Sequence, residues 1–279
     1  MAIGLTLTYF SPLIYLLCIL FIASRQHALA LLVHDAAHFR ISKNKHLNDF
    51  FSNTLASFPC LIGTHAYRLH HLQHHQYLNT DNDPDWARKI HLKEWQFPMP
   101  AKSLFLLLTK QIFVGGYDWI RLVTSMFLSH WRLKNNDPRK KEALLLLGFV
   151  GICITIALAF NFTTQLFLFW FVPLLTVFPM LQRFRSITEH FAADKDFILN
   201  QTRNTDSHWL ERIFLSPHST NRHLLHHLFP SVPHYNLEKL HKNLLSTDLI
   251  YANNQHLNST YLWPSKNSVW KDLTTRTKS

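Results

Sequence analysis

Residues 143–182 read ALLLLGFVGICITIALAFNFTTQLFLFWFVPLLTVFPMLQ, which is 40 consecutive residues without a charged side chain. Polar residues gather only near the middle of the stretch. Because one membrane span takes roughly 17 to 25 apolar residues, the stretch predicts two transmembrane helices, 143–161 and 165–182, joined by a short turn. The alternative, a very apolar hairpin in a soluble core, is disfavoured by this length.

The residues around this stretch indicate its direction. The basic sequence RLKNNDPRKKE (132–142) precedes it, and Arg183 and Arg185 follow it. Basic residues favour the cytoplasmic side, so both outer ends of the pair are predicted to be cytoplasmic. A third uncharged stretch, 3–24, predicts another span that ends at Arg25 and leaves the amino terminus outside. A cleaved signal peptide is the competing interpretation, but the stretch has no basic start.

Two further apolar stretches are interrupted by polar residues. We interpret 50–67 as a re-entrant or interfacial segment and 101–128 as an amphipathic helix in the interface. The expected fold is therefore an all-α integral membrane protein with about three transmembrane helices and interfacial helices. We expect a single domain, 1–279, with a histidine-rich cytoplasmic cap formed by 25–140 and 183–279.

Composition excludes several classes of protein. The chain has 28 Lys and Arg against 17 Asp and Glu, a formal charge of +11, which suits an anionic membrane, nucleic acid or an acidic protein partner. Its three cysteines, Cys18, Cys60 and Cys153, stand apart, so neither a disulfide framework nor a cysteine metal site is indicated. Glycine is rare, and no glycine-rich phosphate loop is present, which argues against nucleotide binding.

Histidines form three clusters with helical spacing. HDAAH contains two of them at i and i+4, and HLQHH and HLLHH each contain three at i, i+3 and i+4. Residues three and four apart on a helix are neighbours, so each cluster can direct its imidazoles to one point. The eight histidines are His34, His38, His71, His74, His75, His223, His226 and His227. Eight nitrogen ligands are too many for one metal ion and enough for two.

The kind of metal follows from what accompanies these clusters. One HxxxH pair alone could be a polar helix face at the membrane rim, but a repeated HxxHH beside it indicates a metal site. Imidazole suits zinc, copper, iron and nickel. The HExxH motif of zinc proteases is absent, and the one ExxH, Glu238 to His241, has no second copy. Sites made almost entirely of histidine beside a membrane point to iron chemistry with oxygen.

The order HDAAH, HxxHH, HxxHH, with spans between the second and third clusters, resembles the integral-membrane fatty-acid desaturase and hydroxylase superfamily. RLHHLQHHQYLNTDNDPDW (68–86) and NRHLLHHLFPSVPHYNLEKLH (221–241) resemble bacterial acyl-chain desaturases, and the likeness covers about residues 25–245. It implies a non-haem di-iron centre on the cytoplasmic face, held by the eight clustered histidines. Members often have one more ligand before the third cluster, which places His190 of SITEH in that role.

The resemblance also suggests which carboxylates orient the ligand rings. The candidate acceptors of imidazole N–H groups are Asp35, Asp81, Asp83, Asp85 and Glu189. Family members usually have two spans before the first cluster, whereas only 33 residues precede His34 here. We expect that the sequence either begins at an internal methionine or has lost one helix.

The activity that the resemblance implies is O2-dependent desaturation, which introduces a C=C bond into the acyl chain of a lipid or acyl-CoA. A hydroxylase or ketolase of alkyl or carotenoid substrates on the same scaffold remains open, as does a non-enzymatic membrane metal-binding protein. Because the chain lacks haem-attachment, iron–sulfur and dinucleotide motifs, electrons must come from a separate donor, ferredoxin-like or a cytochrome. The expected location is the bacterial inner membrane, with the active site facing the cytoplasm and no role for nucleic acid.

Overall fold

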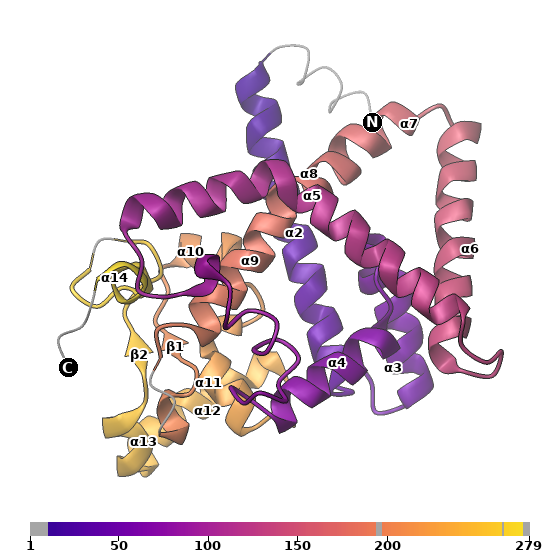
Figure 1. Ribbon diagram of the computed structural model, residues 1–279. Coiled ribbons are helices and arrows are strands. Elements are labelled where there is room, and N and C mark those ends of the chain that lie inside the picture. The colour runs from indigo at the N-terminus through magenta and orange to yellow at the C-terminus, as the bar shows by residue number, and fades with distance from the viewer. Residues whose placement is uncertain (1–10, 194–196, 264, 276–279) are drawn as a thin grey trace.

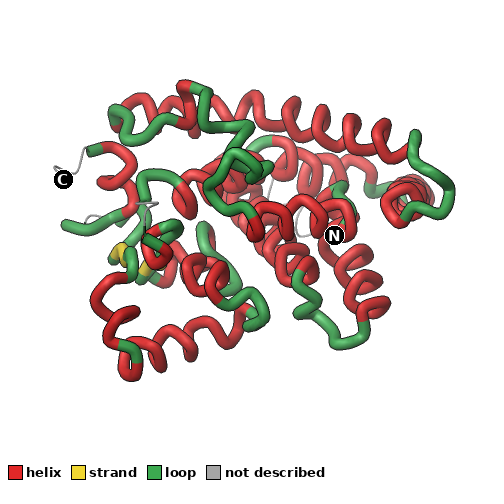
Figure 2. The backbone as a smooth tube through the Cα atoms, turned by 60° about the horizontal axis from the view of Figure 1, so that its bottom comes forward, coloured by secondary structure: helices red, strands yellow, loops and turns green. Residues whose placement is uncertain are grey.

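The computed structural model describes residues 11–193, 197–263 and 265–275, and its regular structure is almost entirely helical (Figure 1; Figure 2). Strands occur among the described residues only as two-residue segments, β1 (Asn204–Thr205) and β2 (Leu257–Asn258), which pair in parallel. The expected all-α class is confirmed.

Three helical segments of the described chain are long and apolar enough to cross a membrane: α2 (Pro12–Ala37), α6 (Pro138–Ala159) and Thr163–His190. The last segment consists of α7 (Thr163–Leu166), the π-helix η4 (Phe167–Phe171), α8 (Val172–Leu175) and α9 (Val177–His190). Three spans were predicted, and three candidates are found. Residues 3–10 of the first predicted span lie outside the described residues.

Two of these helices extend further than their predicted spans. Helix α2 continues past Arg25 to Ala37, and α9 continues past Gln182 to His190. Arginine is a good helix former, so Arg25 does not interrupt α2; its guanidinium donates to Ser24 Oγ at 2.8 Å and to the carbonyl oxygen of Ile213. Both helices carry a histidine in their last turn, His34 in α2 and His190 in α9.

Helix α5 (Ala101–Trp131) is the longest described helix and crosses α8 and α9 of the segment Thr163–His190 (Figure 1). Gly115 and Gly116 lie at the crossing. A Cβ atom at Gly116 would lie 2.3 Å from the carbonyl oxygen of Leu175, and one at Gly115 would lie 2.6 Å from Pro179 Cβ. The absence of a side chain therefore sets the distance between α5 and α8–α9. The expected helix over 101–128 is present; its placement in the membrane interface stays a prediction.

The segment expected to be re-entrant forms a helical hairpin. Its first arm consists of α3 (Lys45–Ser52), the π-helix η1 (Asn53–Ser57) and the 3-10 helix η2 (Phe58–Cys60), and its second arm is α4 (Thr64–Gln76). The chain reverses at Leu61, which has φ 63°. Trp170 Nε1 in η4 donates to the Pro59 carbonyl at 3.0 Å, so the tip of the hairpin lies against η4.

Most of the remaining helices lie on the side of the molecule that carries the carboxyl end of α2, whereas α14 (Val269–Thr274) lies against α5 (Figure 1). The remaining helices are α10 (Trp209–Phe214), α11 (His223–Leu228), α12 (His234–Thr247), α13 (Leu249–Asn254), α14 and the 3-10 helices η3 (Lys93–Trp95), η5 (Ile198–Asn200) and η6 (Thr220–Arg222). Fully buried Arg203 joins them, since it donates to Asp272 Oδ2 at 3.0 Å and to the Phe191 carbonyl. These contacts fix the cap to the end of α9.

Candidate metal centre

The first histidine pair lies at the carboxyl end of α2. His34 is buried in the last turn, and His38 is the C-cap residue. Arg68 of α4 donates to the carbonyl oxygens of Ala36 and Ala37 at 2.9 and 3.1 Å. Both carbonyls lie at the end of the helix, where Ala36 also accepts from Phe39 N and Asn48 Nδ2 at 3.0 Å, so Arg68 and Asn48 together fix the backbone between the two histidines.

A buried arginine also positions the third cluster. His223, His226 and His227 lie on α11, a helix of six residues. Arg222 directly precedes it and pairs with Glu238 at 2.8 Å and Asp206 at 2.7 Å. Neither arginine was predicted from the sequence to act at the site. Their signal is a charged residue beside a histidine cluster: Arg68 ends the uncharged stretch before the second cluster, and Arg222 adjoins the third.

The structure brings all nine predicted histidines into two adjoining groups. The first group is His34, His38, His71, His75 and His226, whose ring nitrogens all lie within 4.8 Å of one another. The second group contains His74, His190 and His227, and also His223, which lies within the same limit of His190 and Glu189. The clusters are therefore interleaved. The second cluster divides its histidines between the two groups, and so does the third.

The distances within each group fit a metal ion. In the first group, Nε2 of His71 lies 2.9 Å from Nε2 of His38 and 3.1 Å from that of His75. In the second, His223 Nε2 lies 3.0 Å from His190 Nε2 and 3.1 Å from His227 Nε2. Nitrogens about 2.1 Å from one ion at right angles lie about 3.0 Å apart, whereas tetrahedral ligands lie about 3.4 Å apart. The ring nitrogens are therefore close enough for each group to share one ion.

Two further observations agree with a metal ion. His34 Nε2 is buried without a hydrogen-bond partner, a costly state for a nitrogen that is not a ligand. Burial, together with the charge that neighbouring histidines would carry, lowers the pKa of His71, His226 and His227 well below the usual range and that of His75 to about 3. These imidazoles are neutral at pH 7, which is the form that donates a lone pair to a metal.

Asp83 orients a ring of the second group. Its carboxylate oxygens lie 2.9 and 3.0 Å from His74 Nδ1, and they also accept the backbone N–H groups of Asn79 and Asp85. Burial raises the pKa of Asp83, but these hydrogen bonds outweigh that effect and hold its pKa below the usual range. An ionised Asp83 keeps the proton of His74 on Nδ1 and leaves the lone pair of Nε2 free to bind a metal ion.

The other four candidate carboxylates occupy different positions. Asp35 bonds His234 Nδ1, and its nearest approach to His34 Nδ1 is 3.8 Å. Asp81 is exposed. Asp85 lies 3.2 Å from Lys89 Nζ and 3.4 Å from His70 Nε2. Glu189 accepts from Arg185 at 2.9 Å and from Thr220 Oγ1 at 2.9 Å, and its Oε2 lies 3.4 Å from His223 Nε2.

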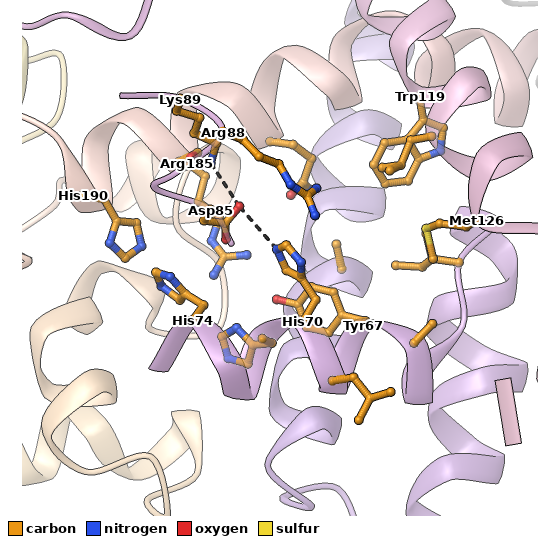
Figure 3. Close-up of a pocket in the computed structure, with 18 of the residues that line it drawn as sticks. Tyr67, His70, His74, Asp85, Arg88, Lys89, Trp119, Met126, Arg185 and His190 are labelled. Carbon is orange, nitrogen blue, oxygen red and sulfur yellow. Dashed lines mark hydrogen bonds and ion pairs between the residues drawn. The ribbon is translucent and has the colours of Figure 1, made fainter. Parts of the chain in front are cut away.

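A cavity of about 480 Å³ adjoins the histidines. His71, His74, His190 and His223 line it, and so do apolar side chains that include Ile62, Trp119, Leu122 and Met126. Figure 3 shows His74 and His190 at one side of the cavity, Trp119 and Met126 at the other, and His70 and Arg88 between them. A molecule in this cavity can therefore contact both the metal-ligand candidates and an apolar wall.

Comparison with known proteins decides the family. The model of the family described as "Fatty acid desaturase" matches residues 10–259. The chain belongs to this family. It is therefore an oxidoreductase of the desaturase class. The three apolar helices of this family member fit a membrane protein.

Individual desaturases are similar at low identity. The dihydrorhizobitoxine desaturase of Bradyrhizobium elkanii is 28% identical over 82% of this chain and 67% of its own length. The omega-3 fatty acid desaturase of Caenorhabditis elegans is 27% identical over 82% of the chain and 60% of its own length. The sn-1 acyl-lipid omega-3 desaturase (ferredoxin) of Nostoc is 26% identical over 88% of the chain and 68% of its own length. The match thus spans about two thirds or less of these relatives.

Proposed function

We propose that this chain is a membrane-bound, non-haem di-iron desaturase that uses O2 to introduce a C=C bond into the acyl chain of a lipid. The observation that carries the proposal is the pair of histidine groups beside a cavity with an apolar wall. In this proposal, the substrate loses one hydrogen from each of two adjacent carbons, and the double bond forms between them. One O2 takes up these two hydrogens together with two electrons and two protons from a donor, which gives two waters. When bound, the iron pair supplies the oxidising power that protein side chains lack.

We assign one iron to each histidine group. His34, His38, His71, His75 and His226 would hold the first, and His74, His190, His223 and His227 the second. Neutral buried imidazoles bind without first losing a proton. Asp83 keeps the Nδ1 proton on His74, and the Arg185–Glu189 pair holds a carboxylate beside His223. The protein's part in the reaction is thus to fix nine nitrogens and to hold the acyl chain away from water.

A separate protein would supply the electrons. The name of the Nostoc relative includes ferredoxin, and the chain's formal charge of +11 is complementary to a small acidic carrier. We place the site on the cytoplasmic face of a bacterial inner membrane, because basic residues flank the apolar pair on the side of the cap. The substrate would be an acyl chain on a lipid or on coenzyme A.

The test is a product assay. The full chain is expressed in a bacterial host, and the mass spectrum of the membrane lipids is compared with that of a His226→Ala/His227→Ala double variant. His46→Ala serves as the matched control, since His46 is an exposed histidine of α3 outside both groups. The proposal expects an acyl product two hydrogens lighter, in the wild type and the His46 variant only. A product that gains oxygen would instead indicate a hydroxylase or ketolase.

A further inference from the structure

Arg88 stands apart from the other cations that line the cavity. Within the part of the chain that the structure describes, it has no hydrogen bond or ion pair. The other lysine and arginine side chains of the lining are paired: Lys89 with Asp85 at 3.2 Å, Arg139 with Asp137 at 2.9 Å and Arg185 with Glu189 at 2.9 Å. The carboxylates of the lining are thus engaged elsewhere, and one guanidinium is left over.

The side chain of Arg88 points into the cavity. Figure 3 shows its guanidinium directed toward the middle of the cavity, beside the ring of His70 and between the two ends described above. The segment that carries it is fixed to the histidines, because Asp83 bonds His74 and Asp85 approaches His70 to 3.4 Å. The backbone at Arg88 is therefore fixed relative to the metal-ligand candidates, while its side chain is exposed to solvent.

A free guanidinium in an otherwise neutralised cavity selects for an anion. Its planar donor groups match the two oxygens of a carboxylate or phosphate, and such charge-assisted pairs are stronger than neutral hydrogen bonds. The end of the cavity with Trp119 and Met126 offers apolar contact instead. A cavity with these two surfaces suits a molecule with one anionic group and one apolar part.

We propose that Arg88 binds the oxyanion end of the substrate, a carboxylate or a phosphate, while the apolar part of the substrate lies in the rest of the cavity, which the candidate metal ligands and apolar side chains line together. This inference rests on the proposed function, since it takes the cavity to be the substrate site. It makes Arg88 a determinant of specificity: an amphiphile with an anionic group is preferred over a neutral one of the same chain length.

The test measures binding to the purified, iron-loaded full chain by equilibrium dialysis. Three probes share one apolar chain and differ at the end: dodecanoate, dodecyl phosphate and dodecanol. We expect at least one anion to bind about 10-fold more tightly than dodecanol, and Arg88→Gln to remove that advantage while leaving dodecanol binding unchanged. Preference for dodecanoate indicates a free carboxylate as the natural group, and preference for dodecyl phosphate a lipid phosphate.

Arg121→Gln is the matched control, because Arg121 is an exposed arginine of α5 outside the cavity lining. Equal binding of all three probes, or an equal loss in the Arg88 and Arg121 variants, would overturn the inference. If Arg88→Gln also loses dodecanol binding and so has misfolded, Arg88→Lys replaces it. That variant keeps the charge without the planar donor pair and is expected to bind the anion with intermediate affinity.

The binding assay requires no turnover, so the two proposals fail separately. Arg88-dependent binding of an anion by a chain that forms no unsaturated product would contradict desaturation and leave the oxyanion site standing. Formation of unsaturated product with no preference for an anion would support desaturation and contradict the oxyanion site at Arg88.

Discussion

The Nε2 atoms of His75 and His226 lie 3.0 Å apart, although 151 residues of sequence separate the two histidines. One lies on α4 and the other on α11. With both imidazoles neutral, their lone pairs face each other unless one nitrogen carries a proton, whereas a shared cation accepts both lone pairs at once. A metal ion bound at this contact would therefore link α4 to α11.

Asp83→Asn is expected to weaken metal binding. The variant removes the negative charge that holds the Nδ1 proton of His74, and changes of this kind cost about 10- to 100-fold in metal affinity. The measurement is the iron retained by purified protein against increasing chelator. Asp81→Asn is the control, since Asp81 is exposed and two residues away. Equal iron retention by the two variants would show that the contact between Asp83 and His74 does not support the ligand.

Acid is expected to destabilise the metal-free protein. Burial lowers the pKa of His38 to about 4 and that of His75 to about 3, so both are far below the ordinary value in the folded state. From about pH 6.5 downward the unfolded chain binds protons that the folded chain does not. Above that pH these groups do not change the free energy of unfolding. Below it, each group lowers the free energy of unfolding by about 1.4 kcal/mol per pH unit until its folded pKa is reached.

The measurement is the Tm of chelator-treated protein in detergent at pH 7.5, 6.5 and 5.5. We expect a small change between the first two values and a clear fall to the third. A double variant, His38→Ala/His75→Ala, should show a weaker fall. A Tm independent of pH over this range would mean that the histidines are not buried as neutral groups.

Gly116→Ala is expected to destabilise the fold. The new Cβ would meet the backbone oxygen of Leu175 at 2.3 Å, and a backbone atom cannot rotate away, so α5 must shift. Overpacking of this kind costs about 1–3 kcal/mol, which exceeds the roughly 0.5–1 kcal/mol gained by removing a glycine from a helix. The Tm should fall by several degrees. Gly148→Ala on α6 is the control, because no atom lies within 4 Å of its Cβ position, and its Tm should stay the same or rise.

The ligand candidates could be predicted because helical spacing alone places i, i+3 and i+4 on one face. How they divide could not be predicted. Local spacing does not give the rotation of α4 against α11, and that rotation places His74 in one group and His75 in the other. His190 was found only through the family likeness, since a single histidine has no spacing to distinguish it.

The partners of charged side chains could not be predicted from their neighbours in sequence either. Arg25 donates to the Ile213 carbonyl, which lies 188 residues further along the chain. Asp35 adjoins His34 in sequence, yet it bonds His234, 199 residues away. Local pattern predicts which residues form helices and which face is apolar. The partners of buried charges depend on tertiary contacts.

The most direct test of the account is the metal content of the purified full chain, measured by elemental mass spectrometry after expression with added iron. The account predicts about two iron atoms per chain in the wild type and in His46→Ala. It predicts about one in His38→Ala, which removes a ligand of the first group, and about one in His227→Ala, which removes a ligand of the second. A wild type with a single metal per chain, with zinc in place of iron, or with unchanged iron in both variants would contradict the assignment.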